Sequence, residues 1–291
     1  MDNLLKNVIL TPFNLLYRVS PKLTLQILFR LKVGYPLNLD DPKTYNEKLQ
    51  WIKLYDHNPL MPKCCDKFLV RDYVKSKGCG EILNELLWEG FDPKEIPFDD
   101  LPKKFVIKAT HGSTFNIICT DKSKLDRKET ISKCQKWLKT KFLLAYGEWY
   151  YGCEKPRIIV EKYLDNLTGM LPEDYKVFCF NGEPAYVAVD TDRSTQHKRN
   201  FYDLEWNFLS DVNTHFDHDT PIEKPTELDA LLKYARILSE SFHHVRVDFY
   251  IIKGQIIFGE LNFANGAGFS PIRPVSFDYK LGSLLHLPNK T

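Results

Sequence analysis

Long hydrophobic runs are missing from this sequence of 291 residues. The apolar stretch from Val8 to Tyr17 contains Pro12 and polar residues, and it is too short to cross a bilayer. We therefore expect no transmembrane segment, and no part of the sequence has the pattern of a cleavable signal peptide. We expect the stretch to pack on the body of the protein or on a partner. A helix that lies at a membrane interface is the alternative.

Three further features are missing: a C-x-x-C pair, a large net charge and a nucleophile triad. The seven cysteines are odd in number and favour reduced thiols in a cytoplasmic protein over a disulfide framework or a zinc site. The formal net charge of +2 predicts no dominant attraction to nucleic acid. No Ser-His-Asp or Cys-His arrangement and no P-loop, G-x-x-x-x-G-K-[ST], can be identified, so other chemistry has to be sought.

The first part of the chain, residues 1–60, is expected to be helical. Apolar residues recur there at helical spacing, and Thr44 to Glu47 forms a capping box that predicts the start of a helix. No catalytic grouping occurs in this segment, which we interpret as scaffold. A short helix is expected over residues 66–78, where Lys67 would lie on a solvated face or at the edge of a site.

Residues 104–119 form a more specific pattern. They predict a strand ending in Lys108, a turn of small residues from His111 to Thr114 and a second strand. A lysine at a strand end beside such a turn suits the phosphates of a nucleotide, because backbone N–H groups and an ammonium group can meet their oxygens. A hairpin with an exposed lysine is the alternative.

Two strands between residues 246 and 262, joined by a tight turn, give the clearest chemical signal. Glu260 and Asn262 are two residues apart and share one face of their strand, and pairing can bring Asp248 opposite them. Two carboxylates and an amide oxygen suit Mg²⁺, which usually completes its coordination with water and phosphate. A hairpin with solvated polar side chains is the alternative. The glycine-rich residues 264–269 predict a flexible loop in which backbone can approach a ligand.

The remaining pattern predicts helices and strands of ordinary length. In order, we expect a helix over 129–142, a strand over 157–164, strands over 174–180 and 184–189 joined by an Asn181-Gly182 turn, a charged loop over 190–199 and a helix over 226–242 capped by Thr226.

In this order the motifs resemble the ATP-grasp superfamily of carboxylate–amine ligases, of which D-alanine–D-alanine ligase is a member. The series is D-K on a helix, a strand with a lysine before a G-S loop, V-E-K-Y-L, a D-x-K strand, a basic loop, and R-V-D with G-E-L-N before a glycine-rich tail. The stretches NLDDPKTYNEKLQWIKLYD, CDKFLVRDYV and HKRNFYDLEWN are similar to the TupA-like ATP-grasp group, named for teichuronopeptide synthesis and found among polysaccharide biosynthesis proteins. The resemblance covers about residues 60–272.

The resemblance implies an α+β ATP-grasp fold, in which two α+β lobes hold ATP between antiparallel sheets, preceded by a helical N-terminal segment. The expected division is a helical segment (1–60), an N-terminal or linker part of the grasp (61–103), the small lobe (104–165) and the C-terminal lobe with the metal site (166–291).

The resemblance also implies roles for individual residues. For the ATP phosphates these are Lys67, Lys108 and Lys176, covered by a loop containing His111, Gly112 and Ser113. For adenine and ribose they are Glu161, the backbone from Lys162 to Leu164, and Asp174. Arg246 joins a metal set of Asp248, Glu260 and Asn262 for Mg²⁺ or Mn²⁺. Catalytic or substrate-binding candidates in a mobile loop are Arg193, His197, Lys198 and Arg199, for which a merely solvated loop is the alternative.

The implied reaction joins a carboxylate to an amine. The carboxylate attacks the γ-phosphate of ATP to give an acylphosphate and ADP, and the amine then displaces phosphate. The group suggests a uronic acid of a cell-surface polysaccharide or its precursor as one substrate and an amino acid or other amine as the second. The reaction would occur in the cytoplasm, with contact at the inner membrane face as an option.

Three alternatives remain at this stage. Asp190-Thr-Asp192 and Asp217-His-Asp219 fit the D-x-D pattern of a glycosyltransferase. The same ATP site could phosphorylate a hydroxyl, which would make the protein a kinase. A non-catalytic ATP-binding scaffold is disfavoured, because all three expected metal ligands are present.

Overall fold

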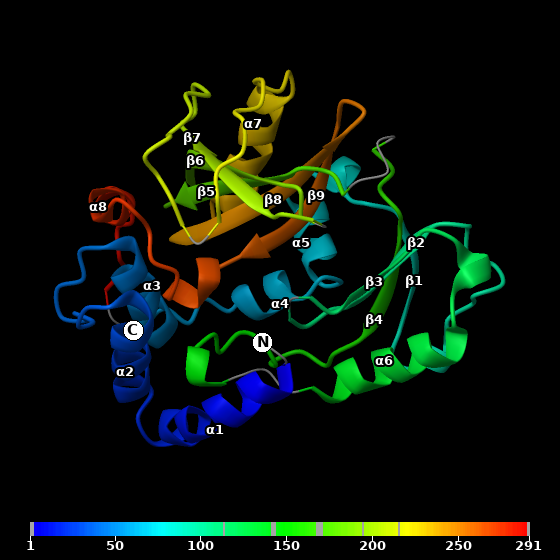
Figure 1. The fold of residues 1–291 in the computed structure, drawn as a ribbon, viewed down its shortest axis with the longest axis horizontal. Helices are drawn as coiled ribbons and strands as arrows, with labels where there is room; N and C mark the ends of the chain where they lie inside the picture. The colour runs from blue at the N-terminus through cyan, green and yellow to red at the C-terminus, as the bar shows by residue number, and fades with distance from the viewer. Residues whose placement is uncertain are drawn as a thin grey trace.

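Two antiparallel sheets and eight helices make up the part of the chain that the structure, a computed structural model, describes: residues 3–112, 114–140, 144–166, 171–193, 195–214 and 216–289 (Figure 1). The helices are α1 (Asn3–Val19), α2 (Pro21–Val33), α3 (Tyr45–Tyr55), α4 (Met61–Cys65), α5 (Val70–Ser76), α6 (Arg127–Lys139), α7 (Leu228–Ser239) and α8 (Val275–Leu284). The strands are β1 (Leu86–Gly90), β2 (Phe105–Ala109), β3 (Asn116–Cys119), β4 (Ile158–Lys162), β5 (Asp174–Phe180), β6 (Glu183–Thr191), β7 (Lys198–Tyr202), β8 (His244–Ile252) and β9 (Gln255–Asn262). Short 3-10 turns are η1 (Gly80–Ile82), η2 (Pro93–Glu95), η3 (Lys122–Lys124), η4 (Leu144–Tyr146) and η5 (Asn265–Gly268).

The smaller sheet has the strand order β1-β4-β2-β3. Phe105 and Ile107 of β2 and Val160 of β4 are fully buried in a core that includes side chains of α6. Because side chains alternate along a strand, Lys108 and Glu161 emerge on the opposite face. The packing of α6 on one face therefore leaves the other face to present charged groups.

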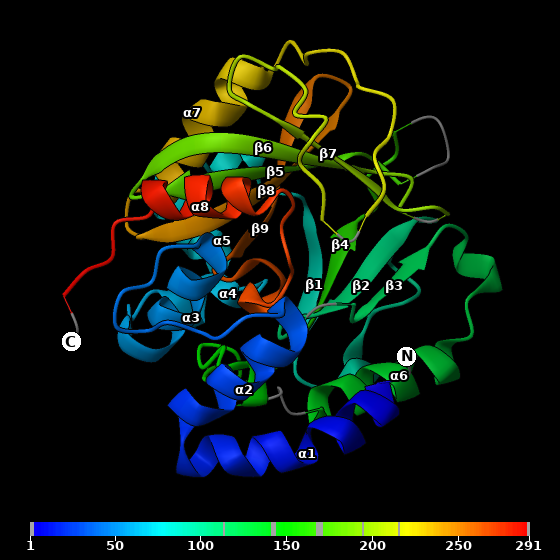
Figure 2. The ribbon, with the colours of Figure 1, turned by 60° about the vertical axis from the view of Figure 1, so that its left-hand side comes forward.

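The larger sheet has the strand order β7-β6-β5-β8-β9, and α7 covers one of its faces with Leu231, Ala235 and Leu238 (Figure 2). The other face divides into two halves. One half is polar, and its residues include Lys176 opposite Asp248. The other half is aromatic and is covered by helices from both ends of the chain.

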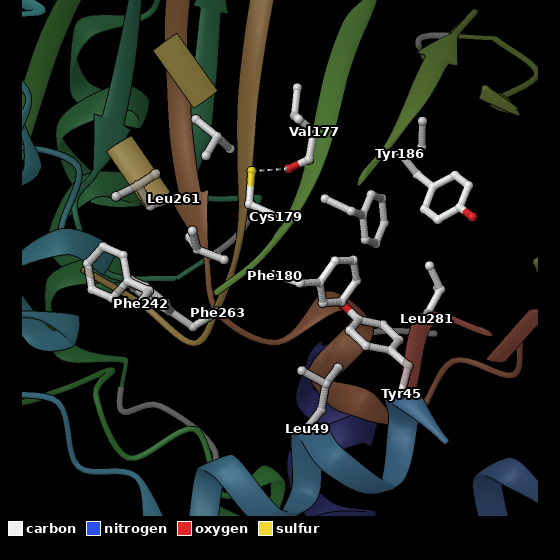
Figure 3. Close-up of a cluster of buried hydrophobic side chains, with 14 of the residues drawn as sticks. Tyr45, Leu49, Val177, Cys179, Phe180, Tyr186, Phe242, Leu261, Phe263 and Leu281 are labelled. Carbon is white, nitrogen blue, oxygen red and sulfur yellow. Dashed lines mark hydrogen bonds between the residues drawn. The ribbon is translucent and has the colours of Figure 1, made fainter. Parts of the chain in front are cut away.

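Helix α3 is the element that covers this aromatic half. Tyr45 packs edge-on against Phe178 and Phe180, and Figure 3 shows its ring beside that of Phe180. The Tyr45 hydroxyl lies 2.8 Å from His244 Nε2. His244 Nδ1 donates to the carbonyl of Cys179 at 2.9 Å, so Nε2 is the acceptor for the tyrosine hydroxyl. Burial lowers the pKa of His244 to about 3, which keeps the imidazole neutral. The N-terminal segment is thus an integral part of the core.

Many of the expected elements are confirmed. The first 60 residues are largely helical, and Thr44 and Glu47 form the predicted capping box at the start of α3. The hairpin turns occur at Asn181-Gly182 and Lys253-Gly254, all four residues having positive φ. Within the described residues, no helix has the length and apolar character needed to cross a membrane.

Two expected elements differ in the structure, and one strand was not predicted. Residues 86–90, for which no element was predicted, form strand β1, an edge strand of the smaller sheet. The charged stretch 190–199 is not all loop, because β6 continues through Thr191 and β7 begins at Lys198, pairing with it. Helix α7 is capped by Glu227 without a side-chain hydrogen bond, and not by Thr226.

Candidate active site

One group of charged side chains comes from the smaller sheet and from the start of α5. Lys108 Nζ donates to Glu161 Oε2 at 2.6 Å, and Arg71 Nη1 lies 3.5 Å from Glu161 Oε1. Lys67 Nζ donates to the carbonyl of Gly112 at 2.8 Å. Together with Gly259 of β9, these side chains line a cavity of about 20 Å³ between the sheets. A cavity of this volume holds about one water molecule, because the paired side chains fill the space between the sheets.

A second group lies on the polar half of the larger sheet, centred on Lys176. Its Nζ is 2.5 Å from Asp174 Oδ2, 3.0 Å from Asp248 Oδ2 and 3.6 Å from Asp190 Oδ2. Burial lowers the pKa of Lys176, but the carboxylates of Asp174 and Asp248 outweigh burial and hold the pKa above its usual value. Lys176 therefore remains a cation in the interior.

Arg246 joins the second group to the first. Its Nε and Nη2 each lie 2.7 Å from an oxygen of Asp248, and its Nη1 donates to Asn265 Oδ1 at 2.6 Å. Glu260 Oε1 is 3.9 Å from Arg246 Nη2, while Glu260 Oε2 is 3.9 Å from Lys67 Nζ. The Glu260 side chain is 42% exposed, compared with 3% for Asp248. Glu260 thus lies at the point where the charges of the two sheets meet.

The expected metal ligands share one face of the β8–β9 hairpin. Asp248 is paired with Glu260, and Arg246 is paired with Asn262. This register depends on a bulge between Asp248 and Phe249, without which the turn would place Asp248 opposite Gly259. Asn262 Oδ1 accepts a hydrogen bond from the Ala264 N–H at 3.2 Å.

This donor set fits Mg²⁺ in its chemistry. Two carboxylates and an amide would supply hard oxygen ligands, although no group of three His, Cys, Asp or Glu in the described residues is placed to hold a metal ion. An ion between Asp248 and Glu260 would share the oxygens of Asp248 with Arg246 and Lys176. Phosphate oxygens and water would complete such a site.

Asp174 and Arg193 lie beside Lys176. Arg193 Nη1 donates to Asp174 Oδ2 at 3.0 Å, and its Nη2 donates to the carbonyl of Pro172 at 3.1 Å. Asp174 Oδ1 is buried and has no hydrogen-bond partner in the described part of the chain. Burial raises the pKa of this carboxyl, and the charges of Lys176 and Arg193 counteract the rise. A buried acceptor without a donor suits a ligand hydroxyl.

Three of the four basic residues expected in a substrate loop approach the second group. Arg193 does so through Asp174, while Arg199 forms a bidentate pair with Asp190, with its Nη2 at 2.7 Å from Oδ2. His197 Nε2 is 3.1 Å from the same oxygen, without hydrogen-bond geometry. Lys198 Nζ instead pairs with Asp219 at 3.0 Å, because it neighbours Arg199 on β7 and points the other way.

The residues expected around phosphate and adenine lie along β2 and β4. His111 is buried with Nε2 at 3.1 Å from the Thr140 carbonyl, and burial lowers its pKa, so the ring is neutral. Gly112 has a φ of +91°, and Ser113 lies outside the described residues. The Lys162 carbonyl accepts a hydrogen bond from Asn84 Nδ2 at 2.9 Å, and Leu164 follows two residues later.

The glycine-rich stretch after β9 differs from the flexible loop that was expected. It forms the 3-10 turn η5, and three side chains of α3 hold its backbone. Gln50 Nε2 donates to the Gly268 carbonyl at 2.7 Å, and Asn46 Nδ2 donates to the Ser270 carbonyl at 3.1 Å. Lys53 Nζ donates to the Ala267 carbonyl at 2.7 Å and to that of Tyr146 at 2.6 Å. Helix α3 therefore fixes the segment that contacts Arg246 through Asn265.

Sequence reasoning did not anticipate several of these partners. Asp190 was considered only as part of a D-x-D pattern, Arg71 was not assigned to a site, and Asn265 and Lys53 had no assigned role. The alternation of side chains along β6 indicates which face of the strand Asp190 lies on. Placing Asp190 opposite Asp174 also requires the pairing register, which is set by a bulge. The partners of Lys53 are 93 and 214 residues away, and local patterns do not predict such contacts.

Comparison with known families agrees with this arrangement. A family model described as TupA-like ATPgrasp matches residues 47–286. The chain belongs to the TupA-like ATP-grasp family. This confirms the resemblance and the α+β ATP-grasp fold, to which the two antiparallel sheets and the N-terminal helices conform. Comparison with curated proteins gives no match.

Solved structures are similar to this TupA-like ATP-grasp protein at low identity, with TM-scores under 0.5. D-alanine–D-alanine ligase from Bacillus anthracis is 19% identical, with a TM-score of 0.42 over 69% of this chain and 57% of that chain. L-amino acid ligase from Bacillus licheniformis is 14% identical, with a TM-score of 0.48 over 87% of this chain and 57% of that chain. Phosphoribosylamine–glycine ligase from Thermotoga maritima is 13% identical, with a TM-score of 0.44 over 70% and 48%. The chain thus spans about half the length of these proteins.

Proposed function

We propose that this TupA-like ATP-grasp protein is an ADP-forming carboxylate–amine ligase that uses ATP and Mg²⁺. The observation that carries the proposal is the meeting of two cationic groups at Glu260. Lys67, between α4 and α5, and Arg246 of β8 each have a side-chain nitrogen 3.9 Å from a Glu260 oxygen. Lys108 of β2 pairs with Glu161, and Lys176 of β5 pairs with Asp248. A triphosphate between the sheets would contact both groups.

The charge balance of the site favours an anionic ligand. Its seven basic side chains are Lys67, Arg71, Lys108, Lys176, Arg193, Arg199 and Arg246. Its five carboxylates are Asp174, Asp190, Asp248, Glu161 and Glu260. The excess of positive charge lies in a partly desolvated cleft, where it interacts more strongly with phosphate than it would in water.

The proposed roles come from the family resemblance, and the contacts of several residues support them. Lys67, Lys108 and Lys176 would bind phosphate oxygens, and Asp174 Oδ1 would accept a hydrogen bond from a ribose hydroxyl. Asp248, Glu260 and Asn262 would hold Mg²⁺, which neutralises phosphate charge in such reactions. Glu161, together with the backbone from Lys162 to Leu164, would face the adenine.

The reaction needs no side-chain nucleophile. The substrate carboxylate attacks the γ-phosphate, the bond to ADP breaks, and the amine then attacks the acylphosphate carbonyl and releases phosphate. The protein contributes by holding the reacting groups in place and by balancing charge as it moves to ADP. Three hydrogen bonds to Asp248 and Asn265 hold the Arg246 guanidinium, so it can orient the transferring group without large movement.

For the carboxylate substrate we propose a uronic acid of a cell-surface glycan or of its precursor, and for the amine an amino acid. Arg193, His197 and Arg199 form a basic rim beside Asp174 and Asp190. A uronic acid carries both a carboxylate for the basic groups and hydroxyls for the acidic ones. The reaction would take place where ATP is supplied, in the cytoplasm.

The test is an assay of ADP and amide formation with ATP, Mg²⁺ and a panel of uronates and amino acids. Hydroxylamine in place of the amine should trap the acylphosphate as a hydroxamate. We expect Arg193→Ala to raise KM for the carboxylate, whereas Lys198→Ala, its matched control, leaves it unchanged because Lys198 pairs with Asp219. If ATP and Mg²⁺ bind but no carboxylate gives ADP, hydroxamate or amide, the proposal is wrong.

The glycosyltransferase alternative has little support. Family membership argues against it, and Asp190 is committed to Arg199 and Lys176 in the interior. Asp219 of the second D-x-D pattern pairs with Lys198 and Thr191. No contact in the described residues favours the kinase alternative over the ligase.

A further inference from the structure

The first two helices carry charge of one sign. No Asp or Glu occurs between Asn3 and Leu39. The basic side chains that the structure describes in this segment are Arg18, Lys22, Arg30 and Lys32, and in this part of the chain none of them forms an ion pair. The positive charge of α1 and α2 is therefore not balanced locally.

The same helices expose large aliphatic side chains. The exposed fractions are 60% for Leu15, 84% for Val19, 45% for Leu23 and 70% for Leu31. Leu15 and Val19 are one turn apart on α1, and Leu23 and Leu31 are two turns apart on α2, so each helix presents an apolar stripe. The opposite side of α2 is buried against the protein body through Leu25, Leu28 and Phe29.

The position of the two helices leaves these stripes accessible. Helix α1 runs along the edge of the molecule in two views, on the side remote from the larger sheet (Figures 1 and 2). We define the α1–α2 surface as Leu15, Val19, Leu23 and Leu31 together with Arg18, Lys22 and Arg30. Arg18 is one turn from Leu15 on α1 and Arg30 is two turns from Leu23 on α2, so each apolar stripe has a basic side chain on its own side of the helix.

We propose that the α1–α2 surface binds an anionic lipid bilayer. The aliphatic side chains would enter the boundary between headgroups and acyl chains, and the basic side chains would meet the lipid phosphates. Neither helix is long and apolar enough to cross the bilayer, so the helices lie on it. The apolar side chains are aliphatic, which suits hydrocarbon and offers no aromatic platform on which nucleic acid bases would stack. This proposal rests on residues far from the nucleotide site and is independent of the proposed ligase activity.

The test is co-sedimentation of the full chain with vesicles, without nucleotide. We expect wild type to sediment with vesicles of phosphatidylglycerol and phosphatidylcholine and to remain in solution with phosphatidylcholine alone. Each basic residue near an anionic surface contributes roughly fivefold in affinity, so Arg18→Glu with Lys22→Glu should weaken binding at least tenfold, and added salt should do the same. Leu23→Glu with Leu31→Glu should abolish sedimentation, because these side chains could no longer enter the bilayer boundary. Both side chains are exposed, so we expect the variant to fold.

Matched variants on other surfaces separate specific from general effects. Lys124→Glu with Lys128→Glu makes the same change of charge near α6, and Val275→Glu alters an aliphatic side chain of α8 that is 41% exposed. Both should sediment like wild type. The proposal is overturned if these controls lose binding as much as the α1–α2 variants do, or if wild type stays in solution with anionic vesicles. It is also overturned if Leu23→Glu with Leu31→Glu instead converts a dimer to a monomer and leaves sedimentation unchanged, because the surface would then join two copies of the chain.

Discussion

The pairing of Asp248 with Glu260 depends on a glycine, and Gly259→Ala tests this dependence. A Cβ at Gly259 would lie 2.9 Å from the carbonyl oxygen of Asp248 and 3.4 Å from Tyr250 Cε2. The nearer atom belongs to the backbone of the neighbouring strand, so it can move only if the bulge moves. If the bulge were lost, the register of the turn would continue and Glu260 would lie opposite Val247, on the face away from Asp248.

The expected magnitude separates stability from ligand binding. Overpacking of this kind costs about 1–3 kcal/mol, so the melting temperature should fall by several degrees. Wild type at ~100 times the dissociation constant of an ATP analogue with Mg²⁺ should gain about 2.7 kcal/mol, and Gly259→Ala should lose most of this gain because the carboxylates no longer converge.

The control is Gly254→Ala in the turn of the same hairpin. Gly254 has a φ of +77°, so alanine there costs about 1–2 kcal/mol of backbone strain without altering the bulge. Thermal unfolding with and without the analogue measures both variants. We expect similar losses of stability, with the ligand-dependent gain retained only in Gly254→Ala. A Gly259→Ala protein that keeps the full gain would refute the idea that the bulge places the metal ligands.

Three further predictions concern buried groups. The pKa of His244 is about 3 in the folded state and about 6.5 in the unfolded state. The neutral imidazole therefore contributes to stability above pH 6.5, and this contribution is lost as the pH falls toward 3. His244→Gln should flatten the stability curve between pH 6.5 and 3, measured by unfolding in urea. Burial raises the pKa of Glu148 to about 7, and the charge of Lys53 counteracts the rise. In Lys53→Met the pKa of Glu148 should therefore rise further. The free energy of unfolding of this variant should fall more steeply than that of wild type as the pH increases from about 6 to about 9. Lys48→Met, which also removes two hydrogen bonds to carbonyls, from Gly282 and Leu285, should show no such added dependence. Asp174→Ala should weaken ATP binding, measured by calorimetry, by about 1–3 kcal/mol. This loss should vanish with a nucleotide that lacks ribose hydroxyls. An equal loss with both nucleotides would exclude the proposed contact between Asp174 and the ribose.

Local patterns predicted most of the elements, because caps, turns and alternation act over a few residues. The capping box of Thr44 and Glu47, the Asn181-Gly182 turn and the strand carrying Lys108 are examples. Contacts across the chain were not predictable in this way. Lys53 has no local feature that distinguishes it from a solvated lysine, yet its ammonium group joins η4 to η5 in the interior.

Pairing register explains why one carboxylate of the site was found and another was missed. A two-residue turn at Asn181-Gly182 predicts that Asp174 faces Val189, which would send Asp190 to the opposite side of the sheet. A bulge between Phe178 and Cys179 shifts the pairing by one residue, and Asp174 then faces Asp190.

A bulge in β8–β9 likewise shifts the register, so that Asp248 faces Glu260 as expected, although the turn alone predicts the other register. Asp248 and Glu260 were grouped by their chemistry, and no comparable motif drew attention to Asp190. At Gly259 a Cβ would touch the neighbouring backbone, so this bulge requires a glycine. A glycine inside a predicted strand is therefore the sequence feature that indicates such a bulge. In the β5–β6 bulge the extra residue is Ala185, between Pro184 and Tyr186. No glycine marks this bulge, and Pro184 is equally typical of the start of a strand, so the position of Asp190 could be learned only from the structure.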